Sequence, residues 1–472
     1  MLPRRYLALA LAVSAVVGGA GAARAVGETD PATALTLGEQ AYDYGIPLLE
    51  SLRVRREMSE VRCADNEGHA PVNTFSHVRR FPDAMFRTVV APNTDTLYSI
   101  SHLDLGQGPL VLRYPDMGSR YFSFALLDPY TNVIATPGVR EDGSRASTVV
   151  VRWAGAPGTT AVPKTARLVT VPNRRVWVIG RTLAGDTNDQ ARAFATMQRY
   201  ALTRLDGTPL PTPPACAKPV RQSFPTPKDG PAFVAALNEA LRADPPPRRD
   251  EPLLARLRPY GIGAGLSPER AGLDPLTLAA LYRGVSGEAA LLLQKAKADA
   301  AAAAVQHRGW YEPPANIGRY GTDYAFRARI ALLGLGANTR EEATYPTGIT
   351  DSMGVLYDGS RNYRLVFGKG QEPPARYFWS LTMYDTDGYL VANDAGRYSL
   401  GPSHPPLRRG PDGSIVIDIR HSQPTDPTVN WLPSPASGGF RLNLRLYGPA
   451  AAALEGDWTP PGVQNLGPAG LS

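Results

Sequence analysis

Short runs of alternating apolar and polar residues dominate two parts of the chain. They occur between residues 73 and 178 and again between residues 342 and 472. Alternation over four to eight residues predicts half-buried strands, and the Pro, Gly, Asn and Asp residues between the runs predict turns. Many short strands joined by regular turns are typical of a sandwich or a barrel-like sheet. The sequence therefore predicts two β-rich parts.

One run of β sequence occurs twice. Residues 120–128 have the sequence RYFSFALLD, and residues 376–385 have the sequence RYFWSLTMYD, which matches after one inserted residue. An internal repeat indicates related structural units. We therefore expect two related β modules that face each other and enclose a common site.

Helical patterns lie before and between the β parts. Asp30-Pro31 and Asp274-Pro275 each place an N-cap residue before a proline at the first helical position. Pro-rich segments around residues 209–219 and 243–252 indicate connections. The predicted fold class is α+β and β-rich, with two antiparallel sandwich-like β domains and a helical connecting region. The predicted parts are a signal peptide (1–25), an N-terminal β-rich domain with opening and closing helices (26–205), the connecting region (206–341) and a C-terminal sandwich-like domain (342–472).

The first 25 residues have the features of a secretory signal. A basic start precedes an apolar run at residues 7–17 and the small-residue site at residues 23–25. The run is shorter than the roughly 20 residues that span a bilayer, and we expect no transmembrane span after signal removal. The sequence predicts a secreted or cell-envelope protein, and Arg4-Arg5 leaves open whether it uses Sec or twin-arginine export.

The charge of the chain limits the classes of partner that it could bind, and its two cysteines suggest a disulfide. Removing residues 1–25 deletes three arginines and no acid, so the formal charge falls from +7 to +4. The remaining charges are interspersed, which argues against a nucleic-acid partner. We expect a small-molecule or glycan ligand, and a homo-oligomer stays open. Cys63 and Cys216 suit one disulfide in an exported protein, although two free thiols are the alternative.

Several long motifs resemble a known bacterial family. APNTDTLYS and the segment from RY to LLDPYTN resemble the domain of unknown function numbered 1254. YDGSRNYRLVF, PPARYFWSLTMYD, NWLPSP and FRLNLRLYGP resemble the companion domain numbered 1214. The resemblance covers roughly residues 42–461 and implies a tandem of β-rich domains with helical insertions. It implies no particular chemistry.

The common enzyme signatures are missing from the sequence. We find no G-x-S-x-G elbow, no S-x-x-K, no H-E-x-x-H and no phosphate-binding glycine loop. The six histidines are scattered, so we predict no metal site and leave the cofactor unknown.

The catalytic candidates lie in the first β part. Asp95 and Asp128 could act as a general base or acid, and Tyr98 could donate a proton. An Asn-Thr-Asp turn that binds its own backbone is the structural alternative for Asp95. The expected substrate-binding residues combine polar and aromatic side chains: Asn93, Tyr130, Trp379, Tyr384, Arg397, Tyr398, Asn430 and Trp431.

Three functions remain open from the sequence. The first is an exported hydrolase or lyase that acts on a small molecule or glycan in a cleft between the modules. The second is a non-catalytic binding protein with a ligand platform of Trp379, Tyr384 and Trp431. The third is a purely structural envelope protein, which would have no concave polar site.

Overall fold

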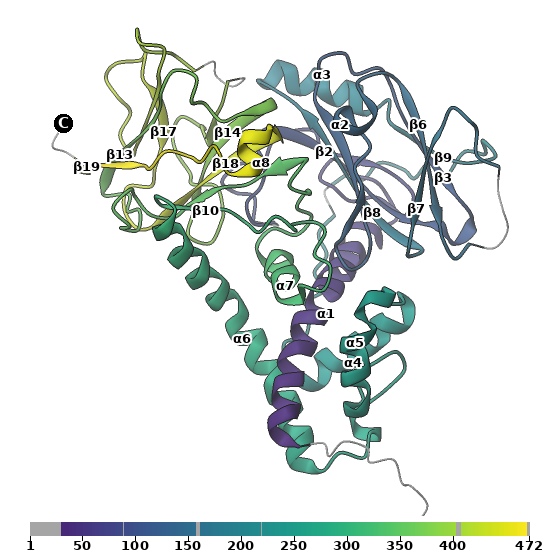
Figure 1. Cartoon of the computed structure of the whole chain (residues 1–472). Coiled ribbons are helices and arrows are strands. Elements are labelled where there is room, and N and C mark those ends of the chain that lie inside the picture. The colour runs from purple at the N-terminus through teal and green to yellow at the C-terminus, as the bar shows by residue number, and fades with distance from the viewer. Residues whose placement is uncertain (1–29, 88, 157–160, 219, 403–406, 470–472) are drawn as a thin grey trace, which may run out of the picture.

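The computed structural model describes residues 30–469 except 88, 157–160, 219 and 403–406, so the predicted signal peptide lies outside the described residues. Figure 1 shows two β domains side by side above a module of helices. Helices α1 and α6 diverge from the base of this module, and each runs toward a different β domain (Figure 1). The helical module thus forms a V-shaped support beneath the two sandwiches (Figure 1).

The N-terminal domain is a sandwich of two sheets whose apolar faces share one core. The first sheet has the spatial order β1 (Ser76–His77), β2 (Thr96–Asp104), β8 (Arg175–Leu183), β4 (Phe122–Leu127) and β5 (Val133–Ala135). The second has the order β7 (Arg167–Val171), β6 (Ser147–Trp153), β3 (Leu110–Tyr114) and β9 (Ala201–Arg204). Of its two helices, α2 (Val139–Asp142) contacts β4, and α3 (Thr187–Met197) contacts β2 and β8.

The C-terminal domain is also a sandwich of two sheets around one core. Its first sheet has the order β10 (Trp310–Tyr311), β12 (Thr347–Gly348), β18 (Phe440–Pro449), β14 (Ala375–Asp385) and β15 (Ser399–Leu400), and β11 (Ala343–Thr344) also pairs with β18. Its second sheet has the order β17 (Asn430–Pro433), β16 (Ile415–Arg420), β13 (Arg361–Phe367) and β19 (Gln464–Pro468). Helix α8 (Ala451–Glu455) follows β18.

The two domains have the same topology. The order β1-β2-β8-β4-β5 in one corresponds strand by strand to β10-β12-β18-β14-β15 in the other, and β7-β6-β3-β9 corresponds to β17-β16-β13-β19. The repeated sequence therefore lies on equivalent strands, β4 and β14. Most pairs are antiparallel, as predicted, but β6 with β7 and β16 with β17 are parallel. This shared exception supports a duplicated unit.

The helical module combines the opening helix of the chain with helices of the connecting region. It contains α1 (Pro31–Ser59), α4 (Gly230–Ala243), α5 (Glu251–Leu257), α6 (Pro275–Gln306) and α7 (Tyr324–Leu333). Asp30 and Asp274 cap α1 and α6 as predicted, through backbone N–H groups of the first turn. The two helices cross at Gly38 and Gly284, where an added Cβ would collide with a carbonyl oxygen of the other helix. Glycine is required there by this close approach.

Helix α6 meets the length and composition of a membrane-spanning helix, contrary to the expectation that no later segment is apolar enough. A core helix of a soluble protein meets the same criteria. Part of α6, including Leu281, Val285 and Leu292, is buried in the core that it shares with α1.

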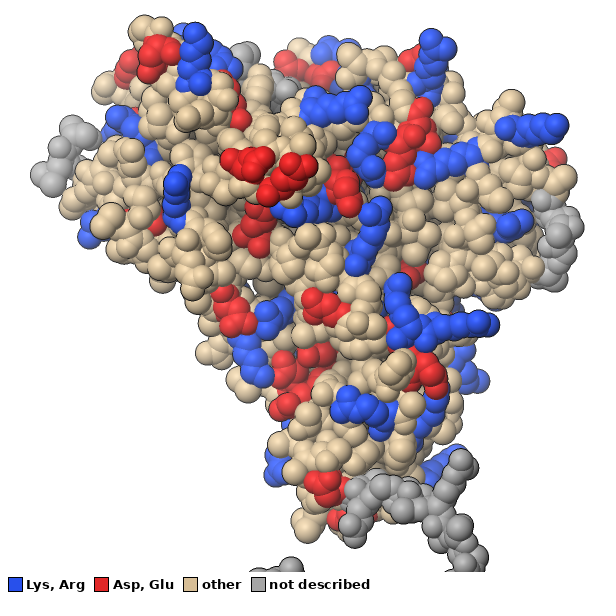
Figure 2. Space-filling view, in the orientation of Figure 1, with Lys and Arg blue, Asp and Glu red and all other residues tan. Residues whose placement is uncertain are grey.

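Cys63 and Cys216 form a disulfide, with their Cα atoms 5.1 Å apart, so the alternative of two free thiols is excluded. The bond joins the segment after α1 to the Pro-rich segment before α4. A disulfide fits a compartment outside the cytosol. On the face shown in Figure 2, basic and acidic side chains are interspersed rather than gathered by sign.

Candidate functional site

The two β domains meet through the sheets that carry the repeated sequence. Tyr121, at the start of β4, lies with its ring centroid 5.1 Å from that of Tyr377, 5.4 Å from Phe378 and 5.3 Å from Tyr447. We call this contact region the seam. It is formed by β2, β4 and β8 of one domain and by β11, β14 and β18 of the other, together with the segments that lead into β2 and β11.

The N-terminal domain contributes a row of three polar side chains to the seam. Tyr98 on β2 pairs with Arg181 on β8, and Ser123 on β4 pairs with Arg181 from the other side. Residues in register on neighbouring strands point to the same face of a sheet. The Arg181 guanidinium lies 5.5 Å from the centre of the Tyr98 ring. The row is therefore a phenol, a guanidinium and a hydroxyl side by side.

The C-terminal domain contributes the same row. Ser380 on β14 pairs with Arg445 on β18. The pairing of Thr344 with Leu446 places the next residue, Tyr345, opposite Arg445 on the other side. Tyr345, Arg445 and Ser380 thus occupy the positions of Tyr98, Arg181 and Ser123 in the duplicated topology.

Each arginine donates from Nη2 to a backbone carbonyl of the opposite domain. Arg181 donates from Nη1 to the Asn338 Oδ1 and from Nη2 to the carbonyl of Gly336, both at 2.8 Å. Arg445 donates from Nη2 to the carbonyl of Ala91 at 3.0 Å. Gly336 and Ala91 each lie two residues before an Asn-Thr pair, and both have a positive φ, +82° and +50°. One hydrogen bond of each arginine therefore follows an approximate two-fold symmetry of the seam, whereas the bond from Arg181 to the asparagine has no counterpart at Asn93.

The segments that lead into the rows are also related in sequence. Residues 93–98 are NTDTLY, and residues 338–345 are NTREEATY, which match after two inserted residues. In both copies an acidic residue lies three positions before the tyrosine of the row. This repeat places a carboxylate of each domain at the seam.

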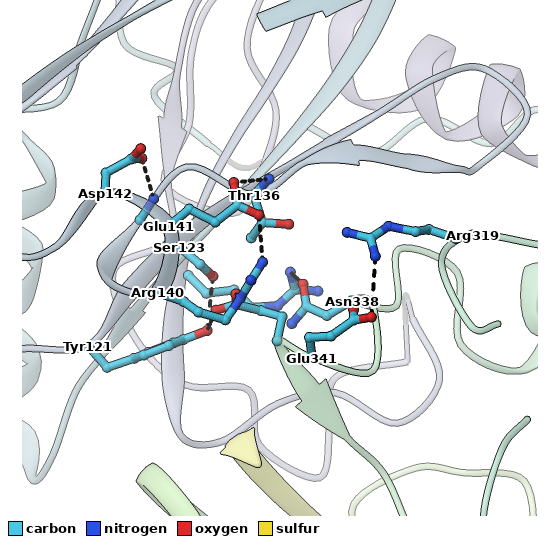
Figure 3. Close-up of polar contacts among 12 residues, drawn as sticks. Tyr121, Ser123, Thr136, Arg140, Glu141, Asp142, Arg319, Asn338 and Glu341 are labelled. Carbon is cyan, nitrogen blue, oxygen red and sulfur yellow. Dashed lines mark hydrogen bonds and ion pairs between the residues drawn. The ribbon is translucent and has the colours of Figure 1, made fainter. Parts of the chain in front are cut away.

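Each of these carboxylates binds a side chain of the opposite domain. The Ser380 hydroxyl donates to Asp95 Oδ2 at 2.6 Å, and the Tyr121 hydroxyl donates to Glu342 Oε1 at 2.6 Å. Arg140 on α2 also donates from Nε to Glu342 at 2.6 Å. Burial raises the pKa of Glu342, and the hydrogen bonds from Tyr121 and Arg140 oppose this rise. Figure 3 shows Tyr121, Ser123 and Arg140 converging at this place.

Two tyrosines keep contact with solvent at an otherwise buried seam. Arg181 is 6% exposed, Arg445 is 3% exposed and Tyr447 is 1% exposed. Tyr98 and Tyr345, by contrast, are partly exposed. Of the six residues in the two rows, only these two are not fully buried.

Four of the residues selected from the sequence lie at the seam. Asn93 donates from Nδ2 to the Tyr447 hydroxyl at 2.5 Å, beside Asp95 and Tyr98. The Tyr384 hydroxyl donates to the carbonyl of Pro92 at 2.6 Å and accepts from Arg445. A fifth, Tyr398, lies nearby, where its hydroxyl accepts from the backbone N–H of Ala84.

Asp128 and Tyr130 lie at a second location, where the turn after β4 contacts the helical module. Asp128 accepts hydrogen bonds from the backbone and the side chain of Asn132. Burial raises its pKa to about 6, although the hydrogen bonds from Asn132 oppose the rise. The Tyr130 hydroxyl donates to the carbonyl of Asp244, and its ring lies beside the buried Arg327.

Arg397, Asn430 and Trp431 lie together at a third location, inside the C-terminal domain. Arg397 donates to the carbonyl of Trp431 at 3.0 Å, and Asn430 donates to backbone carbonyls of its own domain. Trp379 belongs to the apolar core, with Phe367 5.4 Å away. The selected residues thus do not share one cavity, because strand length and sandwich thickness separate them.

The proposed aromatic platform is not exposed. Trp379 is 5% exposed, Tyr384 is 0% exposed and Trp431 is 7% exposed. These rings fill the interior of the domain or the seam, where large aromatic side chains commonly pack.

Two surface cavities lie elsewhere in the molecule, in the helical module. One of about 280 Å³ is lined by Tyr42, Arg53 and Lys228, among others. The other, of about 220 Å³, is lined by Asn238, Glu269 and Tyr282, among others. Within the described part of the chain, no group of three or more His, Cys, Asp or Glu side chains could hold a metal ion.

Sequence reasoning missed half of the seam. It did not select Arg181, Arg445, Tyr345, Glu342 or either serine of the rows. The available signal was the second copy of the Asn-Thr segment at residues 338–345, which two inserted residues obscure.

Comparison with known proteins agrees with this architecture. Residues 72–204 match the model of a protein of unknown function (DUF1254), and residues 342–451 match a second one (DUF1214). No curated protein matches the chain significantly. The crystal structure of the VPA0106 protein from Vibrio parahaemolyticus is similar with a TM-score of 0.66 and 22% identity, over 91% of this chain and 99% of that one.

A second solved structure, an uncharacterized protein from Burkholderia cenocepacia, has 13% identity and a TM-score of 0.41 over 92% of this chain and 94% of its own. The Vibrio structure supports the fold alone. The chain is therefore a two-domain protein of the family in which a DUF1254 domain is followed by a DUF1214 domain.

Proposed function

We propose that the protein is an exported enzyme, a hydrolase or lyase, that acts on a small molecule or glycan at the seam. The observation that carries the proposal is the pair of matching rows, each with a phenol, a guanidinium and a hydroxyl, faced by a carboxylate of the opposite domain. Proton transfer and charge stabilisation need these groups close together, in a place from which water is largely excluded, because water weakens their electrostatic interactions. The predicted signal peptide and the disulfide support export.

Within this proposal Asp95 and Tyr98 have distinct roles. Asp95, 2.6 Å from the Ser380 hydroxyl, takes and returns a proton. Tyr98 is partly exposed beside Arg181 and donates a proton to the leaving group or to a developing anion. Asn93 and Tyr384 position the surrounding groups through their hydrogen bonds across the seam. We assign no role at this site to Asp128, which lies at the second location.

A binding protein with an aromatic platform is less well supported. That function needs ring faces that solvent can reach, and the rings expected to form the platform are buried. The seam instead combines titratable groups with burial, which is typical of catalytic sites.

The test is a screen of the purified mature protein against esters, glycosides and glycans that a lyase can cleave. Asp95→Asn should lose about 100-fold or more of the activity found, because a positioned acid or base contributes about that much. Asp104→Asn is the matched control, because Asp104 lies at the far end of the same strand and pairs with Arg174 outside the seam. Unchanged turnover in Asp95→Asn would remove Asp95 from this role, and a wild-type protein inactive on every class would contradict the enzyme proposal.

A further inference from the structure

Both arginines of the seam are buried charges held by neutral oxygen atoms. Arg181 binds an amide oxygen and a backbone carbonyl. Arg445 binds a backbone carbonyl, the Thr382 hydroxyl and the Tyr384 hydroxyl. A guanidinium keeps its charge at any relevant pH, and burying a charge is costly unless an opposite charge compensates it. Such a pair of cations is suited to an anionic ligand.

The two charges act at one place. Tyr345 lies opposite Arg445 on the neighbouring strand, and Arg181 binds Gly336 and Asn338 in the segment that leads to Tyr345. Tyr345 and the segment before it therefore adjoin both arginines. A ligand that enters beside Tyr345 would meet the two guanidinium groups together.

The two rows and the carboxylates that face them carry one positive charge in excess. Asp95 attracts Arg445, and Glu342 is already paired with Arg140. Arg181 and Arg445 against Asp95 amount to two cations and one carboxylate. A ligand with a single negative charge balances this set, whereas a doubly charged phosphate ester would exceed it.

Hydrogen-bond donors for such a ligand lie in the same region. Asn338 is fully buried, its Oδ1 accepts from Arg181, and its Nδ2 has no hydrogen-bond partner among the residues that the structure describes. Figure 3 shows Asn338 among the polar groups of this region. The phenols of Tyr98 and Tyr345 are partly exposed beside it. A carboxylate accepts several hydrogen bonds at once and matches the planar fork of arginine.

Building on the proposed function, we infer that the small molecule or glycan bound at the seam carries a carboxylate, which Arg181 and Arg445 hold together. A sugar acid, in which a carboxylate is attached to a hydroxylated ring, is the ligand class that fits both the arginines and the phenols. The duplicated rows account for the two arginines, one supplied by each domain.

The test measures binding by calorimetry with D-galacturonate, trigalacturonate, D-galactose, inorganic phosphate and sulfate as probes. The protein is the full mature chain with its disulfide. Binding of the galacturonates, with D-galactose at least about tenfold weaker, is expected, because a charge-assisted hydrogen bond contributes this much or more. Arg181→Lys and Arg445→Lys should each weaken galacturonate binding about tenfold or more. Lysine keeps the positive charge but lacks the planar N–H donors with which a guanidinium binds both oxygens of a carboxylate.

Arg175→Lys is the matched control, since Arg175 lies on the same strand as Arg181 but pairs with Asp244 outside the seam. Binding of galacturonate without turnover supports the inference and contradicts the enzyme proposal. Turnover of neutral sugars that both lysine variants leave unchanged supports the enzyme proposal and overturns the inference. Equal binding of phosphate or sulfate, or no binding of any galacturonate, also overturns the assignment of a carboxylate.

Discussion

Replacing Tyr121 by Phe measures how strongly the seam joins the two domains. The Tyr121 hydroxyl donates to Glu342 at 2.6 Å, and the side chains are 2% and 0% exposed. A buried hydrogen bond to a charged acceptor contributes about 1.5–3 kcal/mol. Phenylalanine keeps the ring contacts, and Glu342 keeps its ion pair with Arg140. We therefore expect the free energy of unfolding to fall by about 2 kcal/mol.

The assay is urea unfolding of Tyr121→Phe, Glu342→Gln and the double variant, with the disulfide intact. These variants form a double-mutant cycle. Because the two side chains bind each other directly, the cycle should give a coupling energy of about 1–2 kcal/mol. Tyr114→Phe is the control, since the Tyr114 hydroxyl binds Asp142 within one domain and should add independently to Glu342→Gln. Additive effects of Tyr121→Phe and Glu342→Gln, within about 0.5 kcal/mol, would mean that this contact does not tie the domains together.

Three further changes test other parts of the structure. Gly284→Ala should lower the free energy of unfolding by about 1–3 kcal/mol in thermal unfolding, because its Cβ collides with the Leu35 carbonyl, and an unchanged melting temperature would contradict the close crossing. Ala91→Gly should raise it by about 0.5–1 kcal/mol, because Ala91 has the left-handed φ that glycine adopts at Gly336, and a loss of stability would argue against this strain. Asp128 has its pKa raised to about 6 from 3.8, so the folded protein retains a proton between about pH 4 and 6 that the unfolded chain has released, and stability falls as pH rises through this window. The free energy of unfolding of Asp128→Asn, measured in denaturant titrations, should therefore rise by up to about 3 kcal/mol relative to that of the wild type between pH 4 and pH 7. A difference that does not depend on pH would contradict the raised pKa of Asp128.

Local patterns predicted the fold well. The repeat at residues 120–128 and 376–385 correctly indicated two related β modules, since equivalent strands β4 and β14 carry it. The dipeptide Asp387-Gly388 is typical of a hairpin turn, and it forms one after β14, with Gly388 at φ +92°. Strand alternation and turn residues are properties of neighbouring residues, so one sequence is sufficient to find them.

The site was only partly predictable, because its rows run across strands. Which residue on β8 lies opposite Tyr98 depends on strand register, and no local pattern distinguishes Arg181 from other arginines of β strands. Asp128 was expected beside Asp95 because the same polar stretch contains both. It lies five residues beyond Ser123 along β4, which is about 16 Å of strand.

The most direct test of the seam as the working site is a ¹³C spectrum of protein labelled at the tyrosine Cζ atoms, titrated with the galacturonate probes. Signals can be assigned with single Tyr→Phe variants. The resonances of Tyr98 and Tyr345 should shift together and saturate. Shifts confined to Tyr42 or Tyr282, which line the two cavities of the helical module, with no change at Tyr98 and Tyr345, would contradict it.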